Sequence, residues 1–219
     1  MTSLLPRALA TLLCVAVLSA CTTGAAGPVA ESPASIAPRP PLAELDVLEN
    51  PRDYRGPSTA VLETASITPV AEAPAQQLPT TVVSRDLAGD VVVTVDDTSR
   101  ILPLDIAGSI ASTVFALGFG DSVVGRDIST TFPEAADLPV VTSSGHAINS
   151  ESVLALRPSI VITDGTIGPT DVVVQLRDAG VTVIYVDAEP GLGAPAELAR
   201  QVAAALGAPE TGEVLATQL

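Results

Sequence analysis

The clearest prediction of a fold class comes from residues 137–165, DLPVVTSSGHAINSESVLALRPSIVITDG. The spacing of apolar residues predicts a short strand over 139–142, a small-residue loop over 143–148 and then a short helix. That helix is expected to end at Arg157, because the proline after it disfavours the helical conformation of the preceding residue. A second apolar strand is predicted over 159–163. The order strand, helix, strand is typical of a parallel α/β sheet.

The predicted loop contains His146, the single histidine of the 219 residues. Asn149 or Ser150 begins the helix that follows, because both residue types accept hydrogen bonds from amides of the first helical turn. His146 is therefore expected in a loop that leaves the carboxyl end of a strand. Open α/β sheets bind their ligands at that edge, so the sequence predicts a ligand site there.

The first twenty residues resemble a secretory signal. Arg7 precedes an apolar run over 8–17, which is too short to span a bilayer as a stable helix. The run leads to Leu18-Ser-Ala-Cys21, which resembles a lipoprotein signal whose cysteine becomes the lipidated first residue. An ordinary signal peptide with an incidental cysteine is the alternative. Two or more acyl chains, at about 0.8 kcal/mol per buried CH₂, anchor a protein to a membrane stably. We therefore expect residues 1–20 to be removed and Cys21 to tether an extracytoplasmic protein to the cell membrane.

Composition excludes several classes of function. The chain has 25 acidic residues against 10 basic ones, all of them arginine, and a net charge of −15. Such a surface repels phosphate backbones, so no nucleic-acid partner is expected. The absence of lysine excludes chemistry that needs a catalytic lysine. With no tryptophan and only three Phe and two Tyr, stacking on sugars or single strands is disfavoured. No cysteine follows Cys21, which excludes thiolate metal sites in the remainder.

The chain divides into three parts after the signal. Residues 21–80 hold ten of the 19 prolines, and we expect an extracytoplasmic spacer with little fixed structure. Residues 81–100 predict a β-hairpin, since two β-rich runs flank turn residues at 88–90. From residue 101 to 219, strands alternate with helices, which predicts an α/β lobe with a parallel sheet.

The spacing of apolar residues, and the glycine or proline residues at the ends of the apolar runs, predict further elements of this lobe. They are a strand at 101–104, helices at 108–117, 171–179 and 196–206, a strand at 181–186, and a helix from Pro209. Because this last helix runs to Leu219 without a closing strand or cap, we expect the chain to be a fragment of a longer protein.

Several motifs resemble known proteins. TSRILPLD at 98–105, LGFGDSVVGRD at 117–127 and LALRPSIV at 154–161 resemble the iron-chelate and cobalamin class of ABC-transporter substrate-binding proteins. Within that class, GRDISTTFP at 125–133 and TSSGH at 142–146 are similar to the haemin-binding lipoproteins of actinobacterial haem uptake systems. The Ser-Gly-His element is the more specific of these, because the other motifs occur across the class.

The resemblance covers residues 81–219 and implies a class III periplasmic-binding-protein fold, in which a long helix joins two α/β lobes with the ligand between them. It implies that this chain holds the first lobe and the start of the connecting helix, and that the second lobe is missing. The family holds haem iron between a histidine of the first lobe and a tyrosine of the second. His146 matches that histidine. No tyrosine matches, since Tyr54 lies in the spacer and Tyr185 ends a predicted strand.

The resemblance therefore makes His146 the expected axial ligand of haem iron, through a neutral imidazole nitrogen. A loop histidine that only bonds to backbone is the alternative, and a zinc site is disfavoured because a lone histidine supplies too few ligands. Arg126 suits a haem propionate, whose carboxylate matches the guanidinium fork, but an ion pair with Asp127 is equally expected. Six further residues are candidate haem or cleft contacts, although a role in shaping loops or lining the cleft explains them equally well. They are Thr130, Thr131, Ser144, Gly145, Gly165 and Thr166.

Together these features predict the lipid-anchored substrate-binding component of a haemin ABC importer, which takes part in iron acquisition by capturing haem and delivering it to the permease. Its expected partners are haemin and the permease and ATPase subunits, with haem as transported ligand and no catalytic cofactor. A ferric-siderophore or cobalamin receptor of the same class is the alternative. A serine hydrolase would have to use His146 with Ser143 or Ser144 as nucleophile. It is disfavoured, because the Gly-x-Ser-x-Gly motif is absent and a serine two or three residues from the histidine in the same loop is poorly placed to pass it a proton. A surface lipoprotein that binds only another protein is permitted by the acidic composition, but no motif points to it.

Overall fold

The computed structural model describes residues 48–57, 65–143, 145–187 and 190–219. The predicted signal, Cys21 and the candidate contact Ser144 lie outside these residues. The chain divides into two units, Met1–Glu63 and Thr64–Leu219. In the first unit a short 3-10 helix, η2 (Pro51–Asp53), is capped by the Asn50 side chain, which accepts a hydrogen bond from the amide of Arg52. All further elements belong to the second unit.

A parallel three-stranded sheet forms the centre of the second unit. Its strands are β3 (Ile101–Leu104), β4 (Ile160–Thr163) and β5 (Thr182–Tyr185), hydrogen-bonded in the order β3-β4-β5. The register aligns Ile101 with Ile160 and Ile160 with Thr182. Every residue of β3 and β4 is buried, as expected where helices cover both faces of a parallel sheet. The three strands were predicted, and the structure confirms them.

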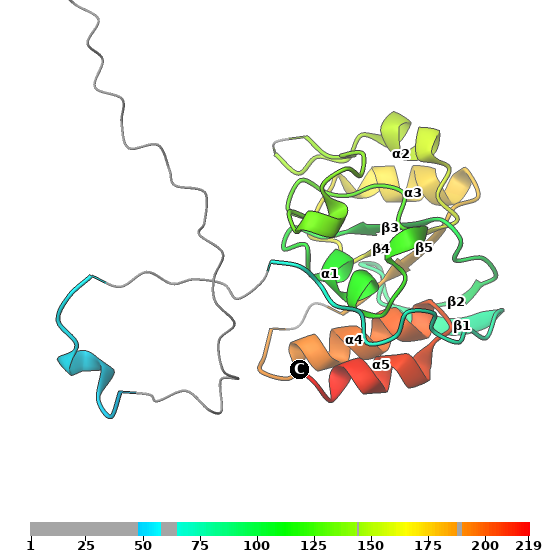
Figure 1. The fold of residues 1–219 in the computed structure, drawn as a ribbon. Helices are drawn as coiled ribbons and strands as arrows, with labels where there is room; N and C mark the ends of the chain where they lie inside the picture. The colour runs from blue at the N-terminus through cyan, green and yellow to red at the C-terminus, as the bar shows by residue number, and fades with distance from the viewer. Residues whose placement is uncertain (1–47, 58–64, 144, 188–189) are drawn as a thin grey trace, which may run out of the picture. The chain divides into compact units, whose positions relative to one another are not determined.

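Helices cover both faces of this sheet (Figure 1). The helices α1 (Ser109–Ala116), α4 (Ala194–Ala205) and α5 (Pro209–Ala216) lie on one face, and α2 (Ser150–Leu156) and α3 (Thr170–Asp178) lie on the other. Short 3-10 turns interrupt the loops that follow α1, namely η3 (Gly120–Ser122) and η4 (Pro133–Ala135). The second unit is thus a three-layer α/β/α lobe.

The apolar core consists of two clusters, because the side chains along each strand alternate between the two faces of the sheet. Successive side chains of a strand point to opposite faces, so neighbouring residues enter different clusters. Ile101, Ile160, Ile162 and Ile184 pack with α1, α4 and α5. Leu102, Val161 and Val183 pack with α2 and α3. The predicted parallel α/β lobe is confirmed in architecture as well as in its strands.

The helix predicted after the His146 loop begins and ends as predicted. The Asn149 side chain accepts a hydrogen bond from the amide of Ser152 at 2.9 Å, and α2 ends where Arg157 adopts the left-handed conformation with φ 46°. The strand predicted over 139–142 is wrong. Val140 forms an isolated parallel bridge with Arg126, and Thr142 forms an antiparallel bridge with Ile148. Because these residues pair with two different partners, no continuous ladder forms.

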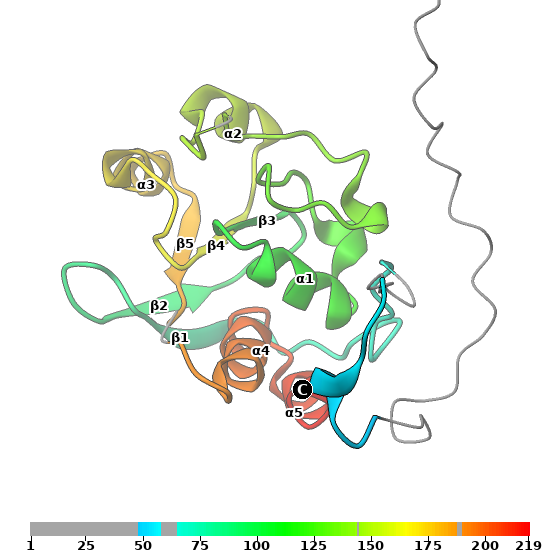
Figure 2. The same cartoon turned by 90° about the vertical axis from the view of Figure 1, so that its left-hand side faces the viewer.

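The predicted hairpin is confirmed as β1 (Thr80–Ser84) paired antiparallel with β2 (Val91–Val95). It is not a separate element, because it belongs to the same compact unit as the sheet and lies beside α4 (Figure 2). The Ser84 hydroxyl accepts a hydrogen bond from the amide of Tyr185 at 2.8 Å. Asp86 forms an ion pair with Arg177 of α3. The hairpin is therefore fixed to the β5 end of the lobe.

The expected spacer ends earlier than predicted, because residues 65–79 pack on the lobe. The amide of Val70 donates to the Ala116 carbonyl and the amide of Gln77 to the Gly207 carbonyl, each at 2.8 Å. The Gln76 side chain donates to the Leu206 carbonyl at 2.8 Å. Carbonyls at a helix end lack partners within the helix, so this segment satisfies the ends of α1 and α4. The proline-rich composition of this segment argued only against continuous β-sheet hydrogen bonding. A proline-rich chain can still form single hydrogen bonds to the ends of helices.

No helix within the described ranges combines the length and the apolar character that crossing a membrane requires.

Candidate ligand-binding site

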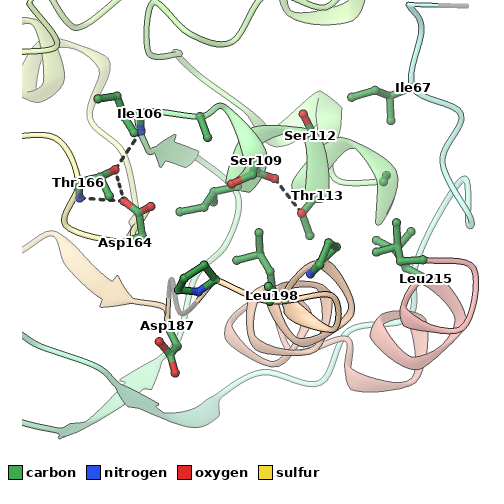
Figure 3. A pocket seen from close by; sticks show the side chains of 18 residues that line it. Ile67, Ile106, Ser109, Ser112, Thr113, Asp164, Thr166, Asp187, Leu198 and Leu215 are labelled. Atoms are coloured by element: carbon green, nitrogen blue, oxygen red, sulfur yellow. Dashed lines mark hydrogen bonds between the residues drawn. The ribbon is translucent and has the colours of Figure 1, made fainter. Parts of the chain in front are cut away.

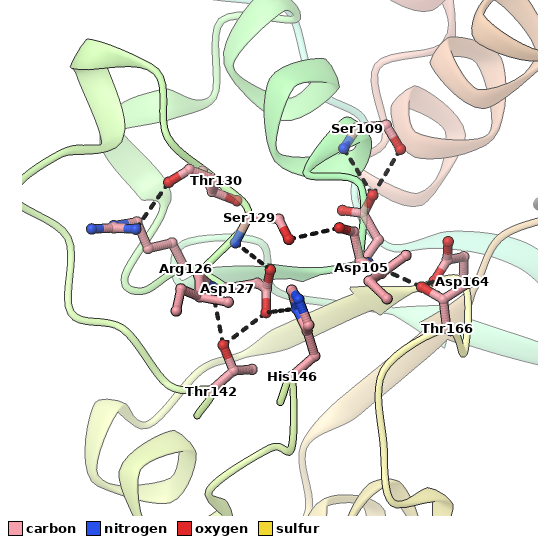
Figure 4. Close-up of polar contacts among 12 residues, drawn as sticks. Asp105, Ser109, Arg126, Asp127, Ser129, Thr130, Thr142, His146, Asp164 and Thr166 are labelled. Carbon is pink, nitrogen blue, oxygen red and sulfur yellow. Dashed lines mark hydrogen bonds and ion pairs between the residues drawn. The ribbon is translucent and has the colours of Figure 1, made fainter. Parts of the chain in front are cut away.

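Loops at the carboxyl ends of the strands converge on one edge of the lobe (Figure 4). The amide of Ile106, just after β3, donates to the Thr166 hydroxyl at 3.0 Å, and that hydroxyl donates to Asp164 just after β4. The Ser129 hydroxyl donates to the Ile106 carbonyl at 2.6 Å. Three loops that are far apart in the sequence are thus joined at the edge where such sheets bind ligands.

Asp105 is one of two buried acids at this edge, with 1% of its surface exposed; the other is Asp127. Its carboxylate accepts hydrogen bonds from the amide and hydroxyl of Ser109, both at 2.8 Å, and from the amide of Ile110 at 3.1 Å. Burial raises the pKa of Asp105 above its ordinary value, and nearby Asp164 adds to this, although the bonds from Ser109 and Ile110 oppose it. Asp105 therefore caps α1, a role that the sequence analysis missed.

His146 lies in a tight loop at the same edge. Its amide donates to the Ser143 carbonyl at 2.9 Å, and the amide of Ser143 donates to the Ala147 carbonyl at 3.0 Å. The backbone φ of His146 is 57°, in the left-handed region. This conformation costs a residue other than glycine about 1–2 kcal/mol, so the surrounding loop must hold it.

The imidazole of His146 faces a buried carboxylate. Nδ1 lies 3.3 Å from Oδ2 of Asp127, whose side chain is 1% exposed, whereas the His146 side chain is 28% exposed. Asp127 also accepts hydrogen bonds from the amide of Ser129 at 2.6 Å and the hydroxyl of Thr142 at 2.7 Å. Burial acts to raise the pKa of Asp127, but the bonds from Ser129, Thr142 and His146 outweigh it and hold the pKa below its ordinary value. A histidine whose Nδ1 meets a carboxylate can offer Nε2 to a metal.

Arg126 does not form the ion pair with Asp127 that was one of its two expected roles. Its guanidinium points away from Asp127 (Figure 4) and donates to the carbonyls of Thr130 at 2.9 Å and Ala136 at 3.4 Å. Its buried Nε and the buried Thr130 hydroxyl have no hydrogen-bond partner among the residues that the structure describes. Arg126 therefore holds the loop that contains Thr130.

The remaining candidate contacts are distributed around the histidine loop and the end of β4. Thr131, Gly145 and Thr166 are exposed, and Thr130 is buried. Gly165 has φ 76°, a conformation that favours glycine, and a Cβ there would lie in tight contact with the Tyr185 ring, at 3.1 Å. Thr166 is tied to the edge through Ile106 and Asp164, as described above.

A largely apolar pocket of about 900 Å³ opens at the same edge, on the face that α1 and α4 cover (Figure 3). The residues that define it include Ile106, Ile110, Leu198, Leu215 and the two acids Asp164 and Asp187. Of the candidate contacts only Thr166 lines it, and His146 does not. Sequence reasoning missed this pocket because its walls come from segments about a hundred residues apart. The one available signal was that Ile106 and Asp187 each follow a predicted strand.

Open α/β sheets bind their ligands at the carboxyl ends of the strands, and the loops described above meet at that edge. The periplasmic binding protein family matches residues 106–219, and the chain belongs to that family. The heme binding protein HmuT, known from a crystal structure, is 38% identical with a TM-score of 0.68, over 72% of this chain and 50% of HmuT. This likeness confirms the expected class III periplasmic-binding-protein fold.

Two curated relatives match more distantly. The "Uncharacterized ABC transporter substrate-binding lipoprotein YvrC" of Bacillus subtilis (strain 168) is 33% identical over 107 residues, which cover 43% of this chain and 33% of YvrC. The vitamin B12-binding protein of Pectobacterium carotovorum subsp. carotovorum (strain PC1) is 27% identical over 114 residues, which cover 52% of this chain and 41% of that protein. The matched part of this chain spans half of HmuT and less than half of each curated relative.

Proposed function

We propose that this protein is the lipid-anchored substrate-binding component of a haemin ABC importer and that His146 is one axial ligand of the haem iron. The observation that carries the proposal is the imidazole of His146, which is held at the ligand edge by Asp127 with Nε2 left for a ligand. Neutral imidazole is a common axial ligand of haem iron. The similarity to a protein named as heme-binding supports the same ligand.

The surroundings of His146 suit a flat ligand that is mainly apolar with a polar rim. The pocket at the same edge of the lobe, which His146 does not line, offers apolar walls such as Ile106 and Leu198, which favour burial of a porphyrin. Within the proposal, the exposed residues Thr131, Gly145 and Thr166, with Gly165, form the polar rim. Arg126 would reach a propionate by exchanging its bonds to the carbonyls of the 130–136 loop. Ser144, which lies outside the described residues, stays a proposed contact because it comes two positions before His146 in the sequence.

The described residues supply no second axial ligand. The Tyr185 side chain is buried, with 4% of the residue exposed, and it packs under Arg177 at 5.7 Å from the guanidinium carbon to the ring centre. Tyr54 belongs to the other unit of the chain. The proposal therefore assigns only one axial ligand of the iron, His146, to this chain.

Location and partners complete the proposal. Cys21 would carry the acyl chains that hold the protein outside the cell membrane, and a permease with its ATPase would receive the haem. The resemblance of the first residues to a lipoprotein signal supports the anchor. A relative named as a substrate-binding lipoprotein of an ABC transporter supports both the anchor and the partners. The relatives are binding proteins, which favours binding over catalysis.

The test is an absorption titration of haemin into the full-length protein and into its His146→Ala variant, with circular dichroism to verify that both fold. We expect a one-to-one Soret change in the parent and a weaker, spectrally different complex in the variant. Equal binding by both proteins would remove His146 as ligand. If neither binds haemin, the haem assignment is wrong. Cobalamin, the ligand named for the vitamin B12-binding relative, and ferric siderophores are titrated in parallel. Tight binding of either one in place of haemin would transfer the proposal to that ligand.

A further inference from the structure

We propose that Asp127 is a positioning residue that fixes the tautomer of His146, keeping the proton on Nδ1 and the lone pair on Nε2. The inference rests on the proposed function for its consequence, since Nε2 is the atom that would bind haem iron. Its structural basis is independent of any ligand, because it concerns the hydrogen bonds of the protein alone.

The hydrogen bonds around Asp127 leave it one role, that of acceptor. Oδ1 accepts from the amide of Ser129 at 2.6 Å, and Oδ2 accepts from the Thr142 hydroxyl at 2.7 Å. That hydroxyl itself accepts a hydrogen bond from the amide of Ile128 at 3.0 Å, so its single proton is directed to Asp127. An ionised carboxylate can only accept, and Nδ1 of His146 lies 3.3 Å from Oδ2. Nδ1 must therefore be the nitrogen that carries the proton.

Asp127 is held firmly enough to orient the ring. The residue before it is fixed by two backbone bonds: the amide of Arg126 donates to the Pro139 carbonyl at 2.9 Å, and the amide of Val141 donates to the Arg126 carbonyl at 3.0 Å. The hydroxyl of Ser129 ties the following turn to Ile106 at the end of β3. The buried carboxylate of Asp127 thus holds the imidazole in a fixed position relative to the sheet edge, although the loop that contains His146 is exposed.

A carboxylate behind the coordinating imidazole has two effects on a bound metal. It fixes the ring orientation before the ligand arrives, and it raises the basicity of the coordinating nitrogen. Replacement of such an outer partner lowers metal affinity by about 10- to 100-fold. We expect an effect of this size on haemin affinity when Asp127 is replaced.

The substitution Asp127→Asn inverts the tautomer without changing the shape of the side chain. The amide of Ser129 is fixed by the backbone and needs an acceptor, so the Asn oxygen must remain there and the Asn NH₂ must occupy the place of Oδ2. The Thr142 hydroxyl, which loses its acceptor, can rotate and accept a hydrogen bond from this NH₂. This NH₂ donates to Nδ1 of His146, which transfers the ring proton to Nε2. A protonated Nε2 has no lone pair for iron. The opposite Asn orientation would place NH₂ against the amide of Ser129.

The first measurement uses the fact that His146 is the single histidine of the chain. Nitrogen-15 NMR of the ligand-free, histidine-labelled protein reports one imidazole and distinguishes its tautomers directly. We expect the Nδ1–H form in the parent and the Nε2–H form in Asp127→Asn. An Nε2–H form in the parent, or the same tautomer in both proteins, would overturn the inference whatever ligand the protein binds.

The second measurement is the haemin titration with Asp127→Asn beside His146→Ala and a matched control, Asp137→Asn, which changes an exposed aspartate in the same way. We expect Asp127→Asn to bind about 10- to 100-fold more weakly, with the spectrum of His146→Ala, and the control to match the parent. Parent-like binding by Asp127→Asn together with a loss in His146→Ala would overturn the inference and leave the proposed function standing. Parent-like binding by His146→Ala would instead refute the proposed ligand, and the NMR result would still decide the role of Asp127.

Discussion

Substitution of Gly118 by alanine tests whether residues 65–79 are part of the folded lobe. Gly118 follows the last turn of α1 with φ 92°, and a Cβ there would lie 1.9 Å from the Ala71 carbonyl oxygen. This oxygen belongs to the backbone and cannot rotate away, so the whole segment has to lift. Gly207, which follows α4, makes the same kind of contact with the Gln77 carbonyl at 2.6 Å.

The expected cost has two parts. A residue with a side chain costs about 1–2 kcal/mol in the left-handed region. Lifting the segment breaks the bond from the Val70 amide to the Ala116 carbonyl, worth about 1 kcal/mol. It also exposes some of the apolar surface of Val70, which packs partly buried against the core. The free energy of unfolding should therefore fall by about 2–4 kcal/mol.

Gly180→Ala is the matched control. Gly180 follows α3 with φ 85°, and nothing lies within 4 Å of a Cβ built there. It should therefore show only the conformational cost of about 1–2 kcal/mol. Urea unfolding followed by circular dichroism compares the three proteins, and limited proteolysis reports on residues 65–79. If Gly118→Ala loses no more stability than Gly180→Ala, the segment does not contribute to the lobe and our reasoning is refuted.

Two other predictions concern stability. His146→Gly should be more stable than His146→Ala by about 1 kcal/mol, because only glycine adopts the left-handed conformation without strain. Thermal melting of the two variants measures this difference, and equal midpoints would contradict a strained His146 backbone. The ion pair with Arg177 lowers the pKa of Asp86, burial opposes this, and the Ser84 hydroxyl assists it. Because the pKa is lower in the folded state, the contribution of Asp86 is present above its unfolded pKa of about 3.9 and is lost as the pH falls through the folded value. Asp86→Asn should therefore lose less stability than the parent between pH 5 and the acid limb below about pH 4. Parallel urea midpoints of both proteins over this range would count against the pair.

The candidate site shows the limit of reasoning from neighbours in the sequence. An ion pair between Arg126 and Asp127 was one of two equally expected roles of Arg126, because the two residues are adjacent. Adjacent residues of an extended chain, however, point to opposite sides. Arg126, in its bridge with Val140, turns to the 130–136 loop, while Asp127 turns inward to meet His146, nineteen residues further along. His146 was identified from its loop, whereas its partner was not.

Most elements of the lobe could be predicted from the sequence. The spacing of apolar residues identified β3, β4 and β5, Asn149 or Ser150 was the predicted start of α2, and glycines identified the ends of α1, α3 and α4, because all of these depend on contacts within a few residues. Only the tertiary structure decided that residues 65–79 join the lobe, that Asp127 meets His146, and that a pocket forms between α1 and α4. These features depend on which distant segments share an edge of the sheet. Packing of the whole chain selects that arrangement, and no local pattern encodes it.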